Sequence, residues 1–281
     1  MNIGIVGLGL MGGSFGRTLY TKGGFKVYGE DLSDSAFLKA ELLHAVSDKL
    51  DEKSAAKLDM LILAVTPDKV ESILEKYLPH LKKGAVVTDF CGIKRGVVKT
   101  MKAFSEKYKD IIFVGGHPMA GREFSGIDHS TATLFAGASM ILVNVNADIF
   151  KLEELKKFYL SLGFKNVEIC SAERHDEEIA FTSQLCHVLS NAFIKNKSAE
   201  SHDGFSAGSY KDMTRVARLN PQMWTELMTE NADNLSKELS ELIDNLNKYL
   251  SALKNKDGET LYKLLYEGNE RKLYLDVKGK K

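Results

Sequence analysis

Cysteine, proline and tryptophan are scarce in this sequence of 281 residues, which contains three, four and one of them. The cysteines, Cys91, Cys170 and Cys186, lie far apart and form no C-x-x-C pair. An odd and scattered set fits a reducing compartment better than a disulfide framework. His, Cys and carboxylate residues nowhere show the spacing of metal ligands, so we expect no bound metal.

Long apolar runs are also missing, and none reaches the roughly 18 residues that a membrane-spanning helix needs. The chain enters an apolar stretch at once, which leaves no room for a signal peptide. Thirty-eight basic residues balance thirty-eight acidic ones, which argues against a general nucleic-acid or membrane-surface role. We therefore expect a cytoplasmic protein with a small-molecule substrate, no nucleic-acid partner and no membrane partner.

A glycine-rich turn follows the first apolar run. Residues 3–6 predict a buried strand and residues 15–20 a helix, with Gly7, Gly9 and Gly12 between them in G-x-G-x-x-G spacing. In a dinucleotide-binding fold these glycines allow a tight turn, close approach of the backbone to the pyrophosphate, and packing of helix on strand. The pyrophosphate would lie at the positive end of the helix dipole.

The next predicted strand, residues 25–29, is followed by Glu30 and Asp31. Asp31 is the candidate for ribose binding. It lies about 20 residues beyond Gly12, where a carboxylate that binds the ribose hydroxyls is expected. The next Lys or Arg is Lys39, so a 2′-phosphate would meet a carboxylate without a nearby cation. The sequence therefore favours NAD over NADP as cofactor.

Short apolar runs alternate with amphipathic stretches up to about residue 170, the pattern of a parallel sheet with helices on both faces. From residue 172 onward the pattern is helical. We expect an α/β fold, with an N-terminal Rossmann-type doubly wound parallel sheet (1–170) followed by an all-α substrate and dimerisation domain (171–281). Strands are expected at 3–6, 25–29, 58–65, 85–90, 111–114, 138–143 and 164–169, and helices at 33–43, 68–77, 94–108, 148–162, 173–196, 210–219 and 259–273.

One further helix is expected to start at Asn220-Pro221, an N-cap followed by proline at the first helical position. Two sets of residues in it recur every seven positions: Met228, Leu235, Leu242 and Tyr249, and Ala232, Leu239, Leu246 and Leu253. A heptad pattern over ~30 residues, or ~45 Å, is typical of a helix that packs on a partner helix. We therefore expect a homodimer formed through the helical domain.

Polar residues end three of the predicted strands, namely Thr66, Asp89 and His117. Ligands of such sheets bind outside the carboxyl ends of the strands. His117, flanked by Gly116 and Pro118, is our candidate for the group that takes a substrate proton, because imidazole can do so near neutral pH. On the 173–196 helix, one face is expected to carry Ser183, Gln184 and His187. We expect the remaining histidines to be structural or on the surface: His44, His80, His129, His175 and His202.

Five segments resemble prephenate dehydrogenases, enzymes of tyrosine biosynthesis, and they occur in the correct order along the chain. Residues 117–123 are similar to the H-P-x-A-G-x-E segment of that family. The other four are the nucleotide loop at 7–14, the loop at 88–94, the S-H-L-P-H-like helix at 183–187, and the D-x-T-R-[IV]-A-like segment at 211–217 with Asn220-Pro221 and Trp224 after it.

The resemblance implies that His117 accepts the proton of the ring 4-hydroxyl while NAD takes the hydride. Loss of CO₂ then gives 4-hydroxyphenylpyruvate on the way to L-tyrosine. It implies that Arg215 holds a substrate carboxylate. The other implied substrate residues are His187, Ser183 and Gln184, with Trp224 as a wall and Glu123 as a gate. The implied cofactor residues are Gly7, Leu8, Gly9, Leu10, Met11, Gly12, Asp31, Val65, Thr66 and Gly92.

Three positions depart from the family pattern. Gly92 stands where many relatives have Ser, Gln184 where His is frequent, and Cys186 where Pro is usual. Gln184 therefore cannot act as an acid or base, and a hydroxyl that would reach the catalytic His is missing. From the length of the chain we expect neither a fused chorismate mutase nor a separate regulatory domain.

Three other functions remain open. Arogenate dehydrogenase differs only in the side chain of its substrate, and the sequence separates the two poorly. A β-hydroxyacid dehydrogenase would need a catalytic Lys on the first long helix of the second domain, and residues 173–194 contain no Lys. An NAD-binding redox sensor would need a DNA- or partner-binding module, and no basic helix-turn-helix pattern is evident.

Overall fold

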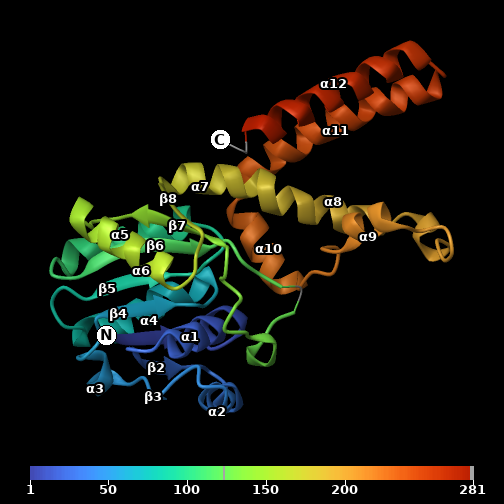
Figure 1. Cartoon of the computed structure of the whole chain (residues 1–281). Coiled ribbons are helices and arrows are strands. Elements are labelled where there is room, and N and C mark those ends of the chain that lie inside the picture. Colours follow the sequence, from blue (N-terminus) through green and yellow to red (C-terminus); the bar gives the residue numbers. More distant parts are fainter. Residues whose placement is uncertain (123, 279–281) are drawn as a thin grey trace. The chain divides into compact units, whose positions relative to one another are not determined.

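The computed structural model describes residues 1–122 and 124–278 of the chain. The chain divides into two compact units, residues 1–231 and the segment from residue 232 onward. Figure 1 shows the elements of both units.

The first unit is built on an eight-stranded sheet with the order β3-β2-β1-β4-β5-β6-β7-β8. Its strands are β1 (Asn2–Val6), β2 (Lys26–Glu30), β3 (Asp48–Lys49), β4 (Met60–Leu63), β5 (Val86–Asp89), β6 (Ile112–Pro118), β7 (Ser139–Asn144) and β8 (Asn166–Cys170). The expected Rossmann-type architecture is confirmed. The prediction of a parallel sheet is confirmed for the other strand pairs, whereas β7 runs antiparallel to β6. A parallel neighbour needs a long crossover, usually a helix. Among the described residues between these two strands, the one helical element is the short 3₁₀ turn Ile127–His129.

Helices cover both faces of this sheet (Figure 1). They are α1 (Leu10–Lys22), α2 (Asp34–Leu42), α3 (Glu52–Ala55), α4 (Val70–Tyr77), α5 (Arg95–Lys107) and α6 (Ile149–Ser161). Successive side chains of a strand point to opposite faces. Met60 and Ile62 of β4 therefore belong to one buried core, and Leu61 and Leu63 to the other. This explains the continuous apolar run of β4, which has no polar face.

The helix starts follow their local sequence signals. Ser33 caps α2 as expected, its hydroxyl accepting the N–H of Ala36 at 3.2 Å. Asp148 caps α6 by accepting the N–H of Lys151 at 2.8 Å. Such caps satisfy N–H groups that have no partner inside the helix. The short elements β3 and α3 were not expected from the sequence, because two and four residues are too few to show a repeating pattern.

The remaining part of the first unit is helical. It consists of α7 (Ala172–Ile179), a π-helical turn (Ala180–Leu185), α8 (Cys186–Phe193), the 3₁₀ turn Lys197–Glu200, α9 (Gly208–Thr214) and α10 (Pro221–Glu230). The single α-helix expected over 173–196 is thus interrupted by a π turn, a feature that is frequent at functional sites.

The helix expected over 210–219 ends at Thr214, so Arg215 lies at its C-cap and Arg218 lies beyond it. Side chains of α8 explain the early end. Ser190 donates to the carbonyl of Met213 at 2.7 Å, and Asn191 donates to the carbonyl of Ala217 at 3.0 Å. The first bond satisfies a carbonyl that a longer helix would have paired with the N–H of Ala217. The second satisfies a carbonyl that a helix ending at residue 219 would have left without an internal partner.

The long helix expected from Asn220 to residue 253 is also interrupted. Its start is confirmed: Asn220 accepts the N–H of Met223 at 3.1 Å, and Pro221 is the first helical residue. It breaks at Asn231, which has φ −115° and ψ 24°. Asn231 is buried, and its amide donates to the carbonyl of Asp176 and to Gln184, each at 2.8 Å. These two contacts hold Asn231 outside the helical path.

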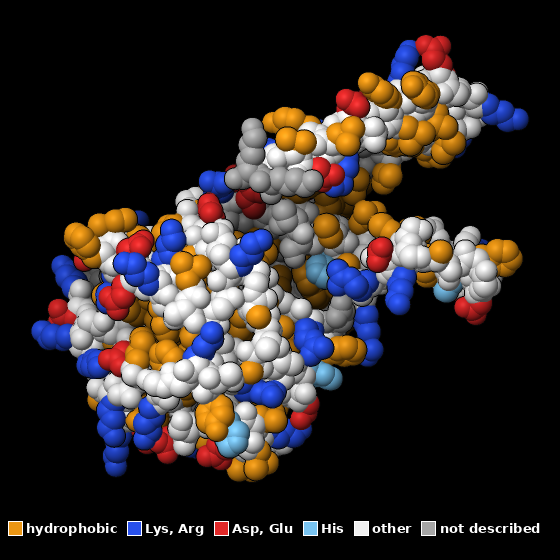
Figure 2. Space-filling model, viewed as in Figure 1, with side chains coloured by type: hydrophobic (Ala, Val, Ile, Leu, Met, Phe, Trp, Pro, Cys, Tyr) orange, Lys and Arg blue, Asp and Glu red, His pale blue; other side chains and the backbone are white. Residues whose placement is uncertain are grey.

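The second unit contains α11 (Ala232–Lys254) and α12 (Gly258–Lys278), which pack on each other. The hydroxyl of Tyr249 in α11 donates to the carbonyl of Leu264 in α12 at 3.2 Å. Large hydrophobic side chains lie exposed along both helices (Figure 2): Ile243, Leu246, Leu250, Leu253, Tyr262, Leu265, Tyr266, Leu273, Tyr274, Leu275 and Val277. Across residues 1–122 and 124–278, no helix has both the length and the apolar character that a membrane crossing requires.

Candidate active site

The glycine turn joins the end of β1 to the start of α1. Gly7 has φ +89°, and a Cβ there would lie 2.4 Å from the carbonyl oxygen of Ala64. A Cβ at Gly12 would lie 1.9 Å from the carbonyl oxygen of Gly7. A Cβ at Gly9 would meet nothing within 4 Å, and Gly9 caps α1 without a side-chain hydrogen bond. The turn is therefore closed on the protein side and open above Gly9, which fits a pyrophosphate at the helix N-terminus.

Asp31 lies directly beside this turn. Its carboxylate accepts the N–H of Leu8 at 2.7 Å and the N–H of Ser33 at 2.9 Å. The preceding carboxylate, Glu30, instead bonds to Lys76 and Tyr77. Two backbone bonds fix the orientation of Asp31 and leave lone pairs that can accept from ribose hydroxyls.

The nearest cation that follows Asp31 in the sequence is already paired. Lys39 forms an ion pair with Asp128 at 2.7 Å. The structure thus shows the carboxylate of Asp31 fixed at the turn, and Lys39 with its charge paired to that of Asp128. This arrangement fits the unphosphorylated ribose of NAD better than the 2′-phosphate of NADP.

The loops after β4 and β5 carry the other expected cofactor residues. Val65 and Thr66 are half-buried, and the Thr66 hydroxyl donates to Asp68. A Cβ at Gly92 would meet only the Leu227 side chain of α10, at 3.5 Å. A serine would therefore fit at position 92, so steric exclusion does not explain why this chain has glycine there.

His117 lies within β6, whereas the sequence placed it after a strand. The antiparallel partner β7 extends β6 through Pro118 and pairs His117 with Ile141. A Cβ at the preceding Gly116 would lie 2.6 Å from the carbonyl oxygen of Asp89. Glycine is thus needed for β6 to approach β5, and His117, which is half-buried, lies near the carboxyl end of its strand, as the glycine turn does.

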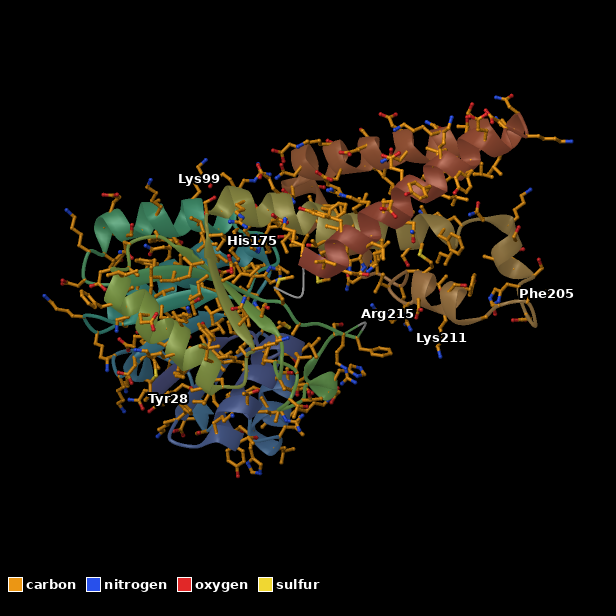
Figure 3. All side chains as sticks on the ribbon, turned by 45° about the horizontal axis from the view of Figure 1, so that its top comes forward. Tyr28, Lys99, His175, Phe205, Lys211 and Arg215 are labelled. Carbon is orange, nitrogen blue, oxygen red and sulfur yellow. The ribbon has the colours of Figure 1, made fainter. Side chains whose placement is uncertain are left out.

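A second histidine contacts His117. The Nδ1 atom of His117 lies 2.8 Å from Nε2 of His175, and Nδ1 of His175 lies 2.6 Å from Oδ1 of Asp176. The expectation that His175 is structural or on the surface overlooked this contact. The signal available in the sequence was an adjacent His-Asp pair in the first helix after the last strand. Figure 3 shows His175 on α7.

Asp176 is fixed by the start of α5. Its carboxylate accepts the N–H of Lys94 at 2.7 Å and the N–H of Arg95 at 2.9 Å, and Arg95 Nε lies 3.3 Å from it. A carboxylate at a helix N-terminus is favoured by the helix dipole. Burial would raise the pKa of Asp176, but the bonds from His175 and from the two backbone N–H groups outweigh it, and the pKa is lowered.

Lys94 and Asp89 form an ion pair whose side chains have no exposed surface. Asp89 also accepts the N–H of Cys91 at 2.9 Å and the N–H of Gly116 at 3.0 Å. These additional bonds are what a buried charge needs in order to be tolerated. The pair ties the loop after β5 to the strand that carries His117.

Both histidines are neutral at pH 7. Burial lowers the pKa of His117 well below its usual 6.5, and the positive forms of His175 and Lys94 lower it further. Burial also lowers the pKa of His175, against the opposing effect of Asp176. A neutral imidazole has one acceptor nitrogen, which is the state that a proton acceptor requires.

The expected substrate residues form a second group around α8. His187 donates from Nδ1 to the carbonyl of Val216 at 3.1 Å, and its ring centroid lies 4.1 Å from that of Trp224. The adjacent Arg215 is exposed at the end of α9 (Figure 3). The structure thus brings His187, Trp224 and the Arg215 segment together.

The other expected substrate residues are placed differently. Ser183 is half-buried in the π turn. Gln184 is 1% exposed, and its amide bonds to the carbonyl of Leu227 at 2.9 Å and to Asn231. Gln184 therefore belongs to a buried hydrogen-bond network that reaches the backbone of Asp176 through Asn231. Glu123 lies outside the described residues.

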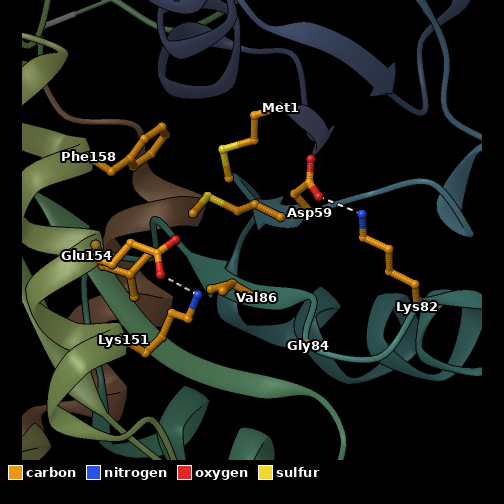
Figure 4. A pocket seen from close by; sticks show the side chains of 10 residues that line it. Met1, Asp59, Lys82, Gly84, Val86, Lys151, Glu154 and Phe158 are labelled. Carbon is orange, nitrogen blue, oxygen red and sulfur yellow. Dashed lines mark hydrogen bonds and ion pairs between the residues drawn. The ribbon is translucent and has the colours of Figure 1, made fainter.

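A separate pocket opens where β4 and β5 begin, away from the glycine turn (Figure 4). Its charged groups are paired, Lys82 with Asp59 and Lys151 with Glu154, each at 2.5 Å. Paired surface charges of this kind contribute little and leave no reactive group. In the part of the chain that the structure describes, no group of three or more His, Cys, Asp or Glu residues could hold a metal ion.

A nucleotide-binding turn and a histidine that can accept a proton together define a nucleotide-dependent dehydrogenase. Two family models match the chain: "Prephenate dehydrogenase, nucleotide-binding domain" over residues 15–168, and "Prephenate dehydrogenase, dimerization domain" over residues 171–267. The chain belongs to the prephenate dehydrogenase family, and it is an oxidoreductase.

Individual relatives agree with this assignment. The chain is 29% identical to a cyclohexadienyl dehydrogenase of Zymomonas mobilis subsp. mobilis, over 98% of this chain and 96% of the relative. A structure of prephenate dehydrogenase from A. aeolicus with hydroxyphenyl propionate and NAD⁺ is 28% identical, with a TM-score of 0.82 over 98% of both chains. The Synechocystis arogenate dehydrogenase is also 28% identical, with a TM-score of 0.79 over 98% of this chain and 100% of that one.

Replacing His117 tests its role as the proton acceptor. The change His117→Asn removes the basic nitrogen but keeps a polar side chain of similar size. We expect kcat to fall by about 10²–10⁴-fold, the usual contribution of general acid–base catalysis, with the Kd for NADH unchanged. The measurements are steady-state kinetics and fluorescence titration, with His80→Asn as the surface control. A kcat within about twofold of the unaltered chain would contradict the assignment.

Proposed function

We propose that this chain is an NAD-dependent prephenate dehydrogenase, which converts prephenate to 4-hydroxyphenylpyruvate and CO₂ in L-tyrosine biosynthesis. The observation that carries the proposal is the neutral His117, held by His175 near the same sheet edge as the glycine turn. The family match supports the reaction class. The A. aeolicus relative, whose structure contains NAD⁺ and hydroxyphenyl propionate, supports the cofactor and an aromatic acid ligand.

In this proposal the turn and Asp31 hold NAD⁺, which when bound supplies the hydride acceptor. The first N–H groups of α1, beside the open face of Gly9, would bind the pyrophosphate. Asp31 would accept hydrogen bonds from the ribose hydroxyls. Val65, Thr66 and Gly92, in the loops after β4 and β5, border the nicotinamide end. The carboxyl ends of the strands, where these loops start, are the usual ligand edge of such a sheet.

His117 accepts the proton of the ring hydroxyl as that carbon is oxidised. The bond to the ring carboxylate then breaks, its electron pair enters the ring, and CO₂ leaves. The ring oxygen takes the proton back from His117, which gives the phenol of the product. Because the ring becomes aromatic, the chain needs only a weak base, and a neutral imidazole with a lowered pKa is sufficient. Burial of the imidazole keeps it unprotonated at pH 7.

The two carboxylates of prephenate need cationic or hydrogen-bonding partners. Arg215 is our proposed carboxylate ligand, because its guanidinium offers two parallel donors. His187 and Trp224, which contact each other beside the Arg215 segment, would line the site together with Ser183. We keep Gln184 and Glu123 as predictions from the resemblance.

A direct comparison of substrates tests the proposed activity. NADH formation is measured at 340 nm with prephenate, arogenate and 3-hydroxyisobutyrate, each with NAD⁺ and with NADP⁺. We expect the highest kcat/KM with prephenate and NAD⁺. A preference for arogenate would make this chain an arogenate dehydrogenase, as its Synechocystis relative is. Turnover of 3-hydroxyisobutyrate alone would overturn the proposal.

Replacing Arg215 tests the carboxylate site. The change Arg215→Gln removes the charge and the parallel donors, and hydrogen bonds to charged groups contribute about 1.5–3 kcal/mol. We expect KM for prephenate to rise about 10–100-fold with a smaller change in kcat, since binding energy is lost in ground and transition states alike. The nearby exposed Arg218→Gln is the matched control. An unchanged KM in Arg215→Gln would remove Arg215 from the site.

We further propose the domains 1–170 and 171–281 and a homodimer through the second of them. The two family models meet at residues 168 and 171, and the second describes a dimerization domain. The exposed apolar residues of α11 and α12 support such an interface, because large exposed apolar patches mark interaction surfaces. Leu246→Glu should shift the mass measured by light scattering from two chains to one, and Lys248→Glu should not. A dimer that survives in Leu246→Glu would place the interface elsewhere.

A further inference from the structure

The contact between His117 and His175 determines which nitrogen of His117 can act as the base. Two hydrogen bonds run in series, from His117 Nδ1 to His175 Nε2 at 2.8 Å and from His175 Nδ1 to Asp176 Oδ1 at 2.6 Å. Each bond requires one proton between its two heavy atoms. The side chains of His175 and Asp176 are 0% and 1% exposed, so water does not compete for either.

The state of Asp176 determines where the protons lie in these two hydrogen bonds. Its carboxylate accepts two backbone N–H groups of the α5 start, and its pKa is lowered, so it is ionised and can only accept. His175 must therefore donate from Nδ1. Since His175 is neutral, its Nε2 carries no proton and must accept, which makes His117 the donor from Nδ1.

The opposite assignment needs a charged His175, and its surroundings disfavour that state. Among the described residues, four charged groups surround His117 and His175 from the β5 loop, α5 and α7: Lys94, Asp89, Asp176 and Arg95. Two of them are cations and two are carboxylates, so they supply no net negative charge to stabilise an imidazolium. The cost of burial then dominates, and it lowers the pKa of His175.

We propose that His175 and Asp176 are positioning residues, which hold His117 in the tautomer with its proton on Nδ1 and so leave Nε2 as the atom that accepts the substrate proton. Free neutral imidazole interconverts between both tautomers, and only this one presents Nε2 as a base. The tautomer follows from the contacts, burial and charges around the pair, and only its use in catalysis rests on the proposed function. An Asp that sets the tautomer of a catalytic His is an established physical arrangement in hydrolases.

The arrangement also explains the buried network behind Asp176. Asn231 donates to the backbone carbonyl of Asp176 and to Gln184, and Arg95 Nη2 donates to Asn231 Oδ1 at 3.0 Å. These bonds fix α7 against α5 and α10. They hold the backbone of Asp176, and the N–H groups of Lys94 and Arg95 hold its carboxylate. The proton pattern of His175 and His117 is therefore fixed as well.

The direct test observes the imidazole nitrogens of the intact chain by ¹⁵N NMR at pH 7.5, without substrate. Long-range ¹H–¹⁵N correlation distinguishes a nitrogen that carries hydrogen from one that does not. We expect hydrogen on Nδ1 in both His117 and His175, and His80→Gln and His117→Asn serve for assignment. Hydrogen on Nε2 of His117, or a doubly protonated His175, would overturn the proposal. This result does not depend on any substrate, so it stands even if neither prephenate nor arogenate is turned over.

A pair of variants tests the use of the tautomer in catalysis. His175→Gln keeps an acceptor for His117 Nδ1, and His175→Leu removes it. We expect kcat to fall at least tenfold further in His175→Leu than in His175→Gln, with the Kd for NADH unchanged in both. His80→Gln is the control, and circular dichroism checks that each variant is folded.

The pH profile separates positioning from a merely structural role. His175 is neutral at pH 7 but gains a proton as the pH falls, and its positive form lowers the pKa of His117. A Gln at position 175 cannot gain this charge. The acidic limb of log(kcat/KM) should therefore move to higher pH in His175→Gln. An unmoved limb, or equal kcat in the Gln and Leu variants, would contradict the proposal. If His175→Leu does not fold, the NMR result on the unaltered chain and the profile of His175→Gln decide the matter.

Discussion

The hydrogen bond between His117 and His175 connects the two parts of the site, because it joins a strand of the sheet to the first helix that follows the sheet. It requires Gly116, since any larger residue there would push β6 away from Asp89. It also requires Asp176, whose carboxylate is held by the start of α5. Sheet, α5 and α7 thus meet at one imidazole, whose position and protonation they determine together.

Burial keeps the imidazole of His117 in the neutral form that can accept a proton. A surface histidine would be partly charged at neutral pH, whereas His117 is kept neutral by desolvation. The same burial would be costly for Lys94 and Asp89, and they are tolerated because they pair and because Asp89 accepts two backbone N–H groups. The buried pair and the half-buried imidazole are therefore parts of one arrangement, in which each charge has a partner of opposite sign and His117 is held by the neutral His175.

The sequence predicted those features that depend on local patterns. The glycine turn, the place of Asp31 beside it, the cap at Ser33, the buried strand β4 and the place of His117 near a strand's carboxyl end all follow from residues close together in the chain. Contacts between distant residues were not predictable. Hydrogen bonds to residues many positions away determine four features: the direction of β7, the break at Asn231, the placement of Gln184 and the contact of His175 with His117. Asn231 shows this most clearly, since nothing in the heptad pattern around it marks a helix break.

The most direct test of the account is a structure of this chain with NAD⁺ and hydroxyphenyl propionate, the ligands present in the A. aeolicus relative. The account predicts that the phenol oxygen lies within hydrogen-bonding distance of His117 Nε2, with Nδ1 still bonded to His175, and with the nicotinamide against the same ring. A phenol oxygen bonded elsewhere, or a His117 ring turned away from His175, would contradict it.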